Sequence, residues 1–339
     1  MRDYFLRRLL LVIPTLIGIT LLVFAITRLV PGGPLERALM EAQQVTMAAG
    51  SSSTVGQGMA LSEAQIQQLK EYYGFDKPWP VSYVEWVWKV VRGDLGTSYR
   101  YNEPVWDVIR SRFPISLFYG LTTLVITYLV CIPLGVVKAI RHRSAMDNLT
   151  SVIVFAGYAV PGYVLGALLL LGFAVNLDWF PMGGFTSMYF HELSTWGKIK
   201  DVIHHAILPL ACYLVGSFAI TTLLMKNNLM DNLAADYVRT AVSKGVPFQR
   251  AVTGHALRNS LIPIATTFGQ NITLLVGGAF LIETIFDIDG FGLLGLTSIL
   301  DRDYPVVMGI ILLSSLLLLI GNILSDILVA AVDPRIRFT

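Results

Sequence analysis

The sequence has few charged residues and almost no cysteine. Asp, Glu, Lys and Arg together make up 14% of its 339 residues, whereas soluble domains carry about 25%. The two cysteines, Cys131 and Cys212, both lie in apolar runs, which predicts buried side chains rather than a disulfide framework or a metal site. The net charge of +2 says nothing about nucleic acid, but the sequence has no basic patch interleaved with aromatic residues, so we expect no nucleic-acid partner.

Motifs of catalysis are also missing. The chain contains no Gly-x4-Gly-Lys-Ser/Thr phosphate loop, no His/Cys/Asp cluster at metal-ligand spacing and no Gly-x-Ser-x-Gly elbow. The pair His204 and His205 precedes an apolar run and is more typical of a membrane interface than of a metal site. We therefore expect no enzyme activity and no cofactor bound by this chain, so any work driven by ATP requires a separate ATPase.

What the sequence does contain is apolar runs of membrane length. Hydrophobic residues make up 54% of the chain, and a span needs about 20 mostly apolar residues. Six candidate spans are 9–30, 115–137, 151–175, 206–225, 262–285 and 305–332. Pro133, Pro161 and Pro209 lie within them and permit kinks. The predicted fold class is an all-α polytopic membrane protein with six transmembrane helices.

Basic residues near the span ends predict the orientation. The short loops 178–205 and 286–304 contain only Lys198, Lys200 and Arg302, whereas basic residues gather in 1–8, 138–150 and 226–261. Because Lys and Arg concentrate in cytoplasmic loops, both termini are predicted to be cytoplasmic. The expected division is 1–30 for the N-terminus and first span, 31–112 for an outer insert, and 113–339 for the core.

The outer insert contains the pattern of a short helix that Gly74 ends, with Trp79, Trp86 and Trp88 nearby. Aromatic residues at this density suit the headgroup region of a bilayer. Two interpretations are compatible: a small helical cap on the outer membrane face, and a docking surface for an extracytoplasmic partner.

The cytoplasmic segment 226–261 has the pattern of two short helices and a corner. Leu229, Leu233, Tyr237 and Ala241 recur at i, i+4, i+8 and i+12, which predicts one helix face. Gly245 suits the position that ends a helix with positive φ, and Pro247 suits the first turn of the next one. An amphipathic loop on the lipid surface and a docking site for another subunit both fit this pattern.

Polar residues within the spans mark a possible route through the membrane, because such residues face a bundle interior or cavity. In the fifth span Thr266, Gln270 and Thr273 share one helix face, and Asn271 lies beside it. A lumen lining and a helix–helix seam give the same pattern. Further polar positions that suit the same lining are Thr122, Thr123, Thr127, Thr221 and Thr222.

Carboxylates near the span ends leave further alternatives. The outer mouth is acidic, with Glu283 and Asp289 among its residues, so it either attracts cationic groups of a transported solute or simply solvates a loop. Asp326, near the inner end of the last span, either pairs with Arg335 or Arg337 or relays protons.

Several short motifs then occur in a consistent order. They are Gly74-Phe-Asp-Lys-Pro78, Gly93-Asp-Leu-Gly96-Thr-Ser98, Tyr237-Val-Arg-Thr-Ala241-x3-Gly245, His255-Ala-Leu-Arg-Asn259-Ser-Leu-Ile-Pro263, Arg302-Asp-Tyr-Pro305-Val and Val332-Asp-Pro-Arg-Ile336. Over nearly the whole chain they resemble inner-membrane permeases of binding-protein-dependent ATP-binding-cassette (ABC) importers, in the dipeptide/oligopeptide branch. Asp289 departs from that pattern, since most members have Pro there. The Leu-Leu-Gly295 ending is similar to the branch that imports longer peptides and antibiotics of the microcin C type.

The resemblance implies a fold, a function and partners. It implies six helices of the type I importer kind with a helical insert after the first, in the bacterial inner membrane. The chain would form half of a peptide pathway together with a homologous second permease subunit, ATPase subunits that bind ATP and magnesium, and a periplasmic peptide-binding protein. An ion-coupled secondary transporter is the alternative, although no span carries an acid at its middle.

The resemblance also implies which residues couple to the ATPase. In the family the short cytoplasmic helix before a conserved Gly sits in a cleft of the ATPase subunit. Carried over to this chain, that role falls on Asp236, Tyr237, Arg239, Thr240, Ala241, Lys244, Gly245 and Val246. A rigid helix pushed by a closing ATPase transmits motion to the spans.

Overall fold

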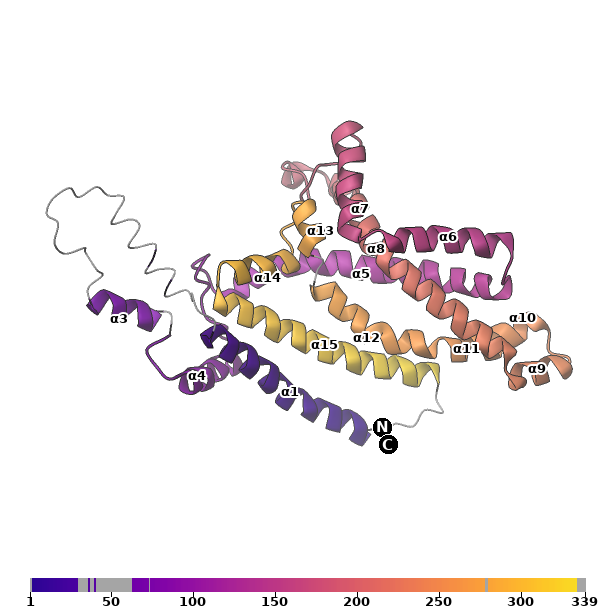
Figure 1. Cartoon of the computed structure of the whole chain (residues 1–339), viewed down its shortest axis with the longest axis horizontal. Helices are drawn as coiled ribbons and strands as arrows, with labels where there is room; N and C mark the ends of the chain where they lie inside the picture. The colour runs from indigo at the N-terminus through magenta and orange to yellow at the C-terminus, as the bar shows by residue number, and fades with distance from the viewer. Residues whose placement is uncertain are drawn as a thin grey trace. The chain divides into compact units, whose positions relative to one another are not determined.

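The computed structural model describes residues 2–29, 36, 40, 63–72, 74–277 and 280–333. Regular structure within these ranges consists of helices, with one isolated bridge between Thr97 and Pro104 (Figure 1). The predicted all-helical class is confirmed.

Four helices in the described ranges are long and apolar enough to cross a membrane. They are α1 (Arg2–Leu29), α5 (Val105–Ile140), α8 (Thr195–Ala234) and α15 (Tyr304–Val332). A fifth crossing exists if the bent pair of α6 (Ala145–Ala159) with α7 (Gly162–Leu169) and η1 (Leu170–Asn176) counts as one span. The predicted span 262–285 is divided between α12 (Ile262–Gly277) and α13 (Phe280–Ile285), and 278–279 lie outside the description. The count of six therefore stays a prediction.

The third predicted span, 151–175, is two helices that meet at 92° rather than one (Figure 1). Val160 is extended, with φ −94° and ψ 119°, because a residue before proline is disfavoured in the helical region. Gly162 then lies against α8, where an added Cβ would come 3.0 Å from the carbonyl oxygen of Cys212. Pro133 and Pro209, in contrast, lie inside the continuous helices α5 and α8.

The chain divides into two compact parts, one of which joins Ile13–Ser111 with Gly295–Ser315. This part contains α3 (Glu63–Tyr72) and α4 (Trp79–Val91) of the insert, and its core is formed by Phe24, Tyr83 and Met308. The Tyr83 hydroxyl shares a hydrogen bond of 3.0 Å with Thr20. The Arg28 guanidinium donates to the carbonyl oxygen of Gly74 at 2.7 Å, so the end of α1 is tied to the turn after α3.

The other part joins Met1–Val12, Arg112–Leu294 and Leu316–Thr339, and it holds two apolar cores. One core surrounds Tyr119, Cys212 and Phe286, and the other surrounds Met225, Leu229 and Val238. The remaining short helices here are α9 (Asp236–Ser243), α10 (Phe248–Ala251), η3 (Val252–Ala256) and α11 (Leu257–Ser260). The helix α14 (Phe291–Leu300) is shared between the two parts.

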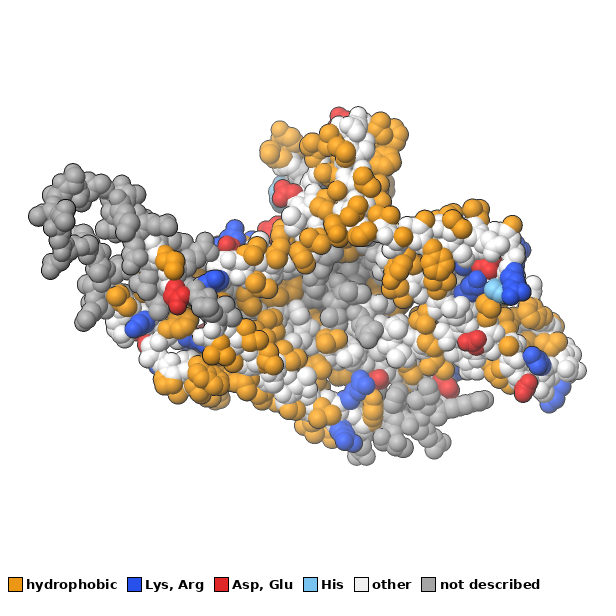
Figure 2. Space-filling model, viewed as in Figure 1, with side chains coloured by type: hydrophobic (Ala, Val, Ile, Leu, Met, Phe, Trp, Pro, Cys, Tyr) orange, Lys and Arg blue, Asp and Glu red, His pale blue; other side chains and the backbone are white. Residues whose placement is uncertain are grey.

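Apolar side chains cover the outer surfaces of α6 and α7 in Figure 2. On α6 they include Leu149, Val152 and Ile153, each more than 60% exposed. A surface of this kind has its natural contact with lipid tails or with another apolar helix.

Asp326 on α15 forms an ion pair with Arg8 and accepts a hydrogen bond from the Tyr4 hydroxyl at 3.1 Å. The sequence favoured Arg335 or Arg337 as its partner, and both lie outside the described residues. The carboxylate therefore has an arginine partner, but this partner comes from the opposite end of the chain.

Candidate functional site at the end of α8

The candidate site is the corner formed by α9 and α10, which follows the end of α8 (Figure 1). The helix α8 stops at Ala234 because Ala235 is extended, with φ −72° and ψ 147°. This break makes the predicted stripe of Leu229, Leu233, Tyr237 and Ala241 wrong. Leu229 is fully buried, yet Tyr237 is 41% exposed, and Val238 instead faces the core at 3% exposure.

Gly245 ends α9 as predicted. Its φ is +87°, a conformation that side chains with a Cβ rarely adopt. The N–H of Gly245 donates to the carbonyl of Val242 at 2.9 Å, and the N–H of Val246 donates to that of Ala241 at 3.1 Å. These two bonds form a Schellman cap, which satisfies the last carbonyls of the helix. Pro247 directly precedes α10, so the chain reverses within a few residues.

Most residues assigned to coupling lie on the surface of this corner. The exposed ones are Asp236, Tyr237, Arg239, Thr240, Lys244 and Gly245, whereas Ala241 and Val246 are half-buried. Two large apolar side chains beside them are also exposed, Val242 at 41% and Phe248 at 50%. Exposed apolar side chains mixed with charges are typical of a surface that another protein covers.

The corner is nevertheless firmly attached to the helices behind it. The Tyr237 hydroxyl donates to Asn232 Oδ1 at 2.6 Å and accepts from Asn259 Nδ2 at 3.0 Å, which links α9 to both α8 and α11. Val238 packs into the apolar core around Met225. The helix α9 is thus held against α8 and α11 by two exposed hydrogen bonds and by the buried side chain of Val238.

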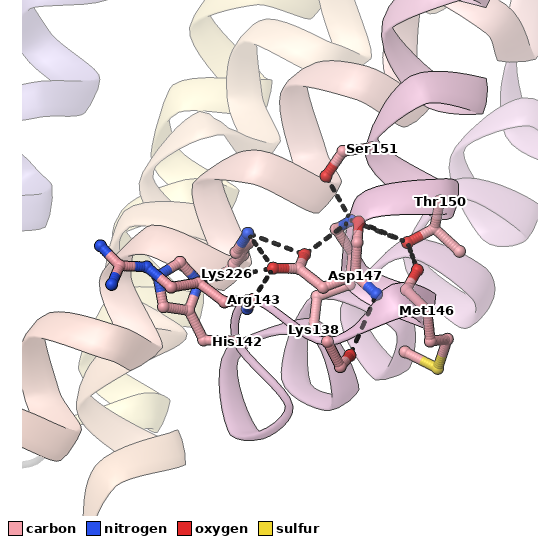
Figure 3. A network of polar contacts seen from close by, with 9 residues as sticks. Lys138, His142, Arg143, Met146, Asp147, Thr150, Ser151 and Lys226 are labelled. Atoms are coloured by element: carbon pink, nitrogen blue, oxygen red, sulfur yellow. Dashed lines mark hydrogen bonds and ion pairs between the residues drawn. The ribbon is translucent and has the colours of Figure 1, made fainter.

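A buried ion cluster, shown in Figure 3, involves the same helix α8 that leads to the corner. The Lys226 ammonium on α8 is 2.8 Å from each carboxylate oxygen of Asp147, in the first turn of α6. The Lys138 ammonium, near the end of α5, is 3.0 Å from the same carboxylate. It also donates to Thr150 Oγ1 and Ser151 Oγ, each at 2.8 Å. One carboxylate thereby joins three helices.

The Asp147 carboxylate also accepts a hydrogen bond of 3.0 Å from the Arg143 N–H, so its charge is compensated although the side chain is buried. The exposed fraction is 0% for Lys138 and 2% for Asp147. Sequence reasoning missed this cluster, because it counted these charges only toward membrane orientation. The signal that was present is the position of Asp147 three residues after Ser144, as the acid in a first helical turn.

The comparison with known families decides the class of protein. Residues 131–338 match the family described as the inner membrane component of binding-protein-dependent transport systems. This chain belongs to that family. Its members are transport permease subunits rather than catalytic enzymes, and the resemblance drawn from the short motifs is confirmed.

Curated relatives of this permease match it from end to end. The peptidoglycan transport system permease protein YejB of Agrobacterium fabrum is 37% identical, over 100% of this chain and 99% of its own. The oligopeptide transport system permease protein AppB of Bacillus subtilis is 37% identical over 100% of both. The dipeptide transport system permease protein DppB of Escherichia coli is 33% identical over 99% of both. The ion-coupled alternative is not supported.

The pathway residues predicted in the fifth span are described only in part. Thr266 is exposed and donates to the Ile262 carbonyl at 2.9 Å, while Asn271 Nδ2 donates to the Tyr128 hydroxyl at 2.9 Å. The side chains of Gln270 and Thr273 lie outside the description. The assignment of these four residues to a pathway stays a prediction.

The two acids predicted at the outer mouth differ sharply in exposure. Glu283 is 0% exposed, and its carboxylate accepts from Ser116 Oγ at 2.9 Å and from the Leu293 N–H at 2.6 Å. It therefore caps the start of α14 in this structure. Asp289 has a side chain that is 66% exposed and pairs with Arg112 at 2.8 Å. Of the two, only Asp289 has a carboxylate that solvent reaches.

Within the described ranges, no three His, Cys, Asp or Glu side chains are grouped as metal ligands, and both cysteines are buried free thiols.

Proposed function

We propose that this chain is a permease subunit of an ATP-driven importer of peptides and forms half of the translocation pathway. The observation that carries the proposal is the full-length match to permeases of peptide, oligopeptide and peptidoglycan transport systems. The geometry of the α9 corner supports it independently, since an exposed helix on a buried base suits the transmission of force.

The partners follow from this function. They are a homologous second permease subunit, ATPase subunits that bind ATP and magnesium, and a periplasmic peptide-binding protein. The chain itself binds no cofactor in this scheme. Six spans with both termini in the cytoplasm place the segment 226–261 on the ATPase side and the insert 31–112 on the side of the binding protein.

The coupling step is mechanical. An ATPase cleft receives the exposed face of α9, including Tyr237, Arg239 and Thr240, and Val242 and Phe248 supply apolar contact. When the ATPase subunits close on ATP, they push α9. Because Val238 and the Tyr237 hydroxyl fix α9 to the core, the push moves α8 rather than bending the corner.

Replacing Val242 with glutamate tests the coupling surface. A buried charge at the contact lowers peptide-stimulated ATP hydrolysis and peptide uptake by on the order of tenfold or more, the effect of losing a central interface residue. The measurement uses the complete importer in proteoliposomes, with the amount of permease quantified by immunoblot. Gly245→Trp gives the same loss, because a residue with a Cβ is strained at φ +87° and the new ring projects from the exposed corner into the contact.

Val91→Glu is the matched control, since Val91 is also an exposed valine on a helix (73% exposed), but it lies in the outer insert. It leaves the amount of folded permease and the ATP hydrolysis measured without binding protein unchanged. Parental rates of coupled hydrolysis in both corner variants, with normal protein levels, would exclude α9 as the docking element.

A further inference from the structure

A pocket of about 650 Å³ lies within the core part of the chain, remote from the α9 corner. Its walls come from α5, the bend between α6 and α7, the middle of α8, α12 and α13. The lining residues with hydroxyl or amide groups are Thr123, Thr127, Tyr128, Tyr158, Tyr213, Ser217, Thr221 and Asn271. Its volume lies in the range of about 300–1,000 Å³ that ligand pockets occupy.

One polar group in this wall is left without a partner. Thr127 is 3% exposed, and its hydroxyl has no hydrogen-bond partner among the described residues. A buried hydroxyl of this kind costs free energy unless something else completes its hydrogen bonds. Beside it the Tyr128 hydroxyl and the Asn271 amide are joined at 2.9 Å, with lone pairs to spare.

The rest of the lining fixes the charge and polarity of an occupant. Apolar surface comes from residues such as Leu124, Ile220 and Ile282. No Asp, Glu, Lys, Arg or His is among the described residues that line the pocket. A charged group placed there would lose its hydration without any counter-charge, so the pocket suits an uncharged, largely apolar ligand with a few hydrogen-bonding groups.

We propose that this pocket is a subsite for an uncharged apolar or aromatic side chain of the transported peptide. The Thr127 hydroxyl completes its hydrogen bonds with the backbone amide of the peptide next to that side chain, because this amide offers both a donor and an acceptor. The proposal rests on the proposed function, since it names a part of the peptide that such an importer would carry. A lipid tail is the poorer occupant, because it leaves the hydroxyl and amide groups of this wall unpaired.

Gly216→Phe fills the pocket and tests the proposal. Gly216 lines the pocket, and a Cβ added there meets no atom within 4 Å, so the new ring enters open space. The assay measures uptake of Ala-Phe-Ala, Ala-Ala-Ala and Ala-Glu-Ala by the complete importer in proteoliposomes with one binding protein. We expect uptake of Ala-Phe-Ala to fall on the order of tenfold relative to Ala-Ala-Ala, the scale on which pocket contacts discriminate.

Gly172→Phe is the matched control, because Gly172 also has no atom within 4 Å of an added Cβ but does not line the pocket. It keeps the parental preference. An unchanged ratio of Ala-Phe-Ala to Ala-Ala-Ala uptake in Gly216→Phe would overturn the proposed subsite.

Loss of the phospholipid that copurifies with the parent, together with that unchanged ratio, would assign the pocket to an acyl chain instead. If the parent importer takes up none of the three peptides, the proposed function fails rather than the subsite alone.

A second pair of variants tests the same proposal without adding a large side chain, so the result does not depend on whether Gly216→Phe folds. Thr127→Val removes the hydroxyl with little change in shape, so we expect a higher melting temperature together with slower uptake of Ala-Phe-Ala. Thr127→Ser keeps the hydroxyl and retains uptake. If Thr127→Val transports Ala-Phe-Ala at the parental rate, the hydroxyl has no role in binding and the proposal is wrong.

Discussion

Asp147→Asn is expected to lower the free energy of unfolding by about 3–5 kcal/mol, the cost of removing one partner from a buried ion pair. The substitution leaves the ammonium groups of Lys138 and Lys226 buried without the carboxylate that now lies within 3.0 Å of each. Thermal or chemical unfolding of the purified permease in lipid nanodiscs measures the loss. The exposed Asp236, whose side chain is 99% accessible, supplies the control Asp236→Asn, which leaves stability unchanged.

A triple replacement separates charge from packing. Asp147→Leu with Lys138→Met and Lys226→Met removes all three charges at similar volume, and it recovers most of the stability that Asp147→Asn loses. If the triple variant is no more stable than the single one, the loss arises from shape rather than from uncompensated charge.

Gly269→Leu is the second substitution with a large expected effect. An added Cβ at Gly269 would lie 2.6 Å from the backbone oxygen of Gly321, so α12 and α15 must separate. Membrane helices approach closely only where small residues meet. We expect a loss of at least about 1–3 kcal/mol, the usual cost of overpacking, and a fall in the amount of folded protein. Gel filtration in detergent and thermal unfolding measure both.

Gly18→Leu controls for the general effect of a large side chain on a membrane helix. A Cβ at Gly18 on α1 meets nothing within 4 Å, so this variant folds like the parent. If Gly18→Leu and Gly269→Leu have the same stability and the same amount of folded protein, the contact between α12 and α15 accommodates a larger side chain and the prediction is wrong.

The sequence was sufficient for features that depend on neighbouring residues. Apolar length located the long helices, and the Gly245 turn followed from the tolerance of glycine for positive φ. The three prolines show where local reasoning stops. Each was expected to permit a kink, yet only Pro161 separates two helices. The difference lies in tertiary packing, since Gly162 beside Pro161 fits closely against Cys212 on α8.

The site residues show the same limit. Glu283 was grouped with Asp289 by its place near a span end, but its burial depends on Ser116, 167 residues away in the chain. The cluster at Asp147 likewise joins residues 79 positions apart, Asp147 and Lys226. Spacing along one helix cannot reveal such pairs, whereas it does reveal that α9 carries an exposed face.

The continuity of helix α8 also bears on the order of two events in the proposed importer, the closing of the ATPase subunits and the release of the bound side chain. Gly216 in the pocket wall, Lys226 in the ion cluster and Ala234 beside the corner all lie on this one helix. Gly216 and Ala234 are 18 positions apart, which corresponds to about 27 Å of continuous helix. A continuous helix of this length bends little. A displacement of its end at the corner therefore also displaces the part of α8 that lines the pocket. Release of a bound side chain and the stroke of the ATPase would then be a single event rather than two successive ones.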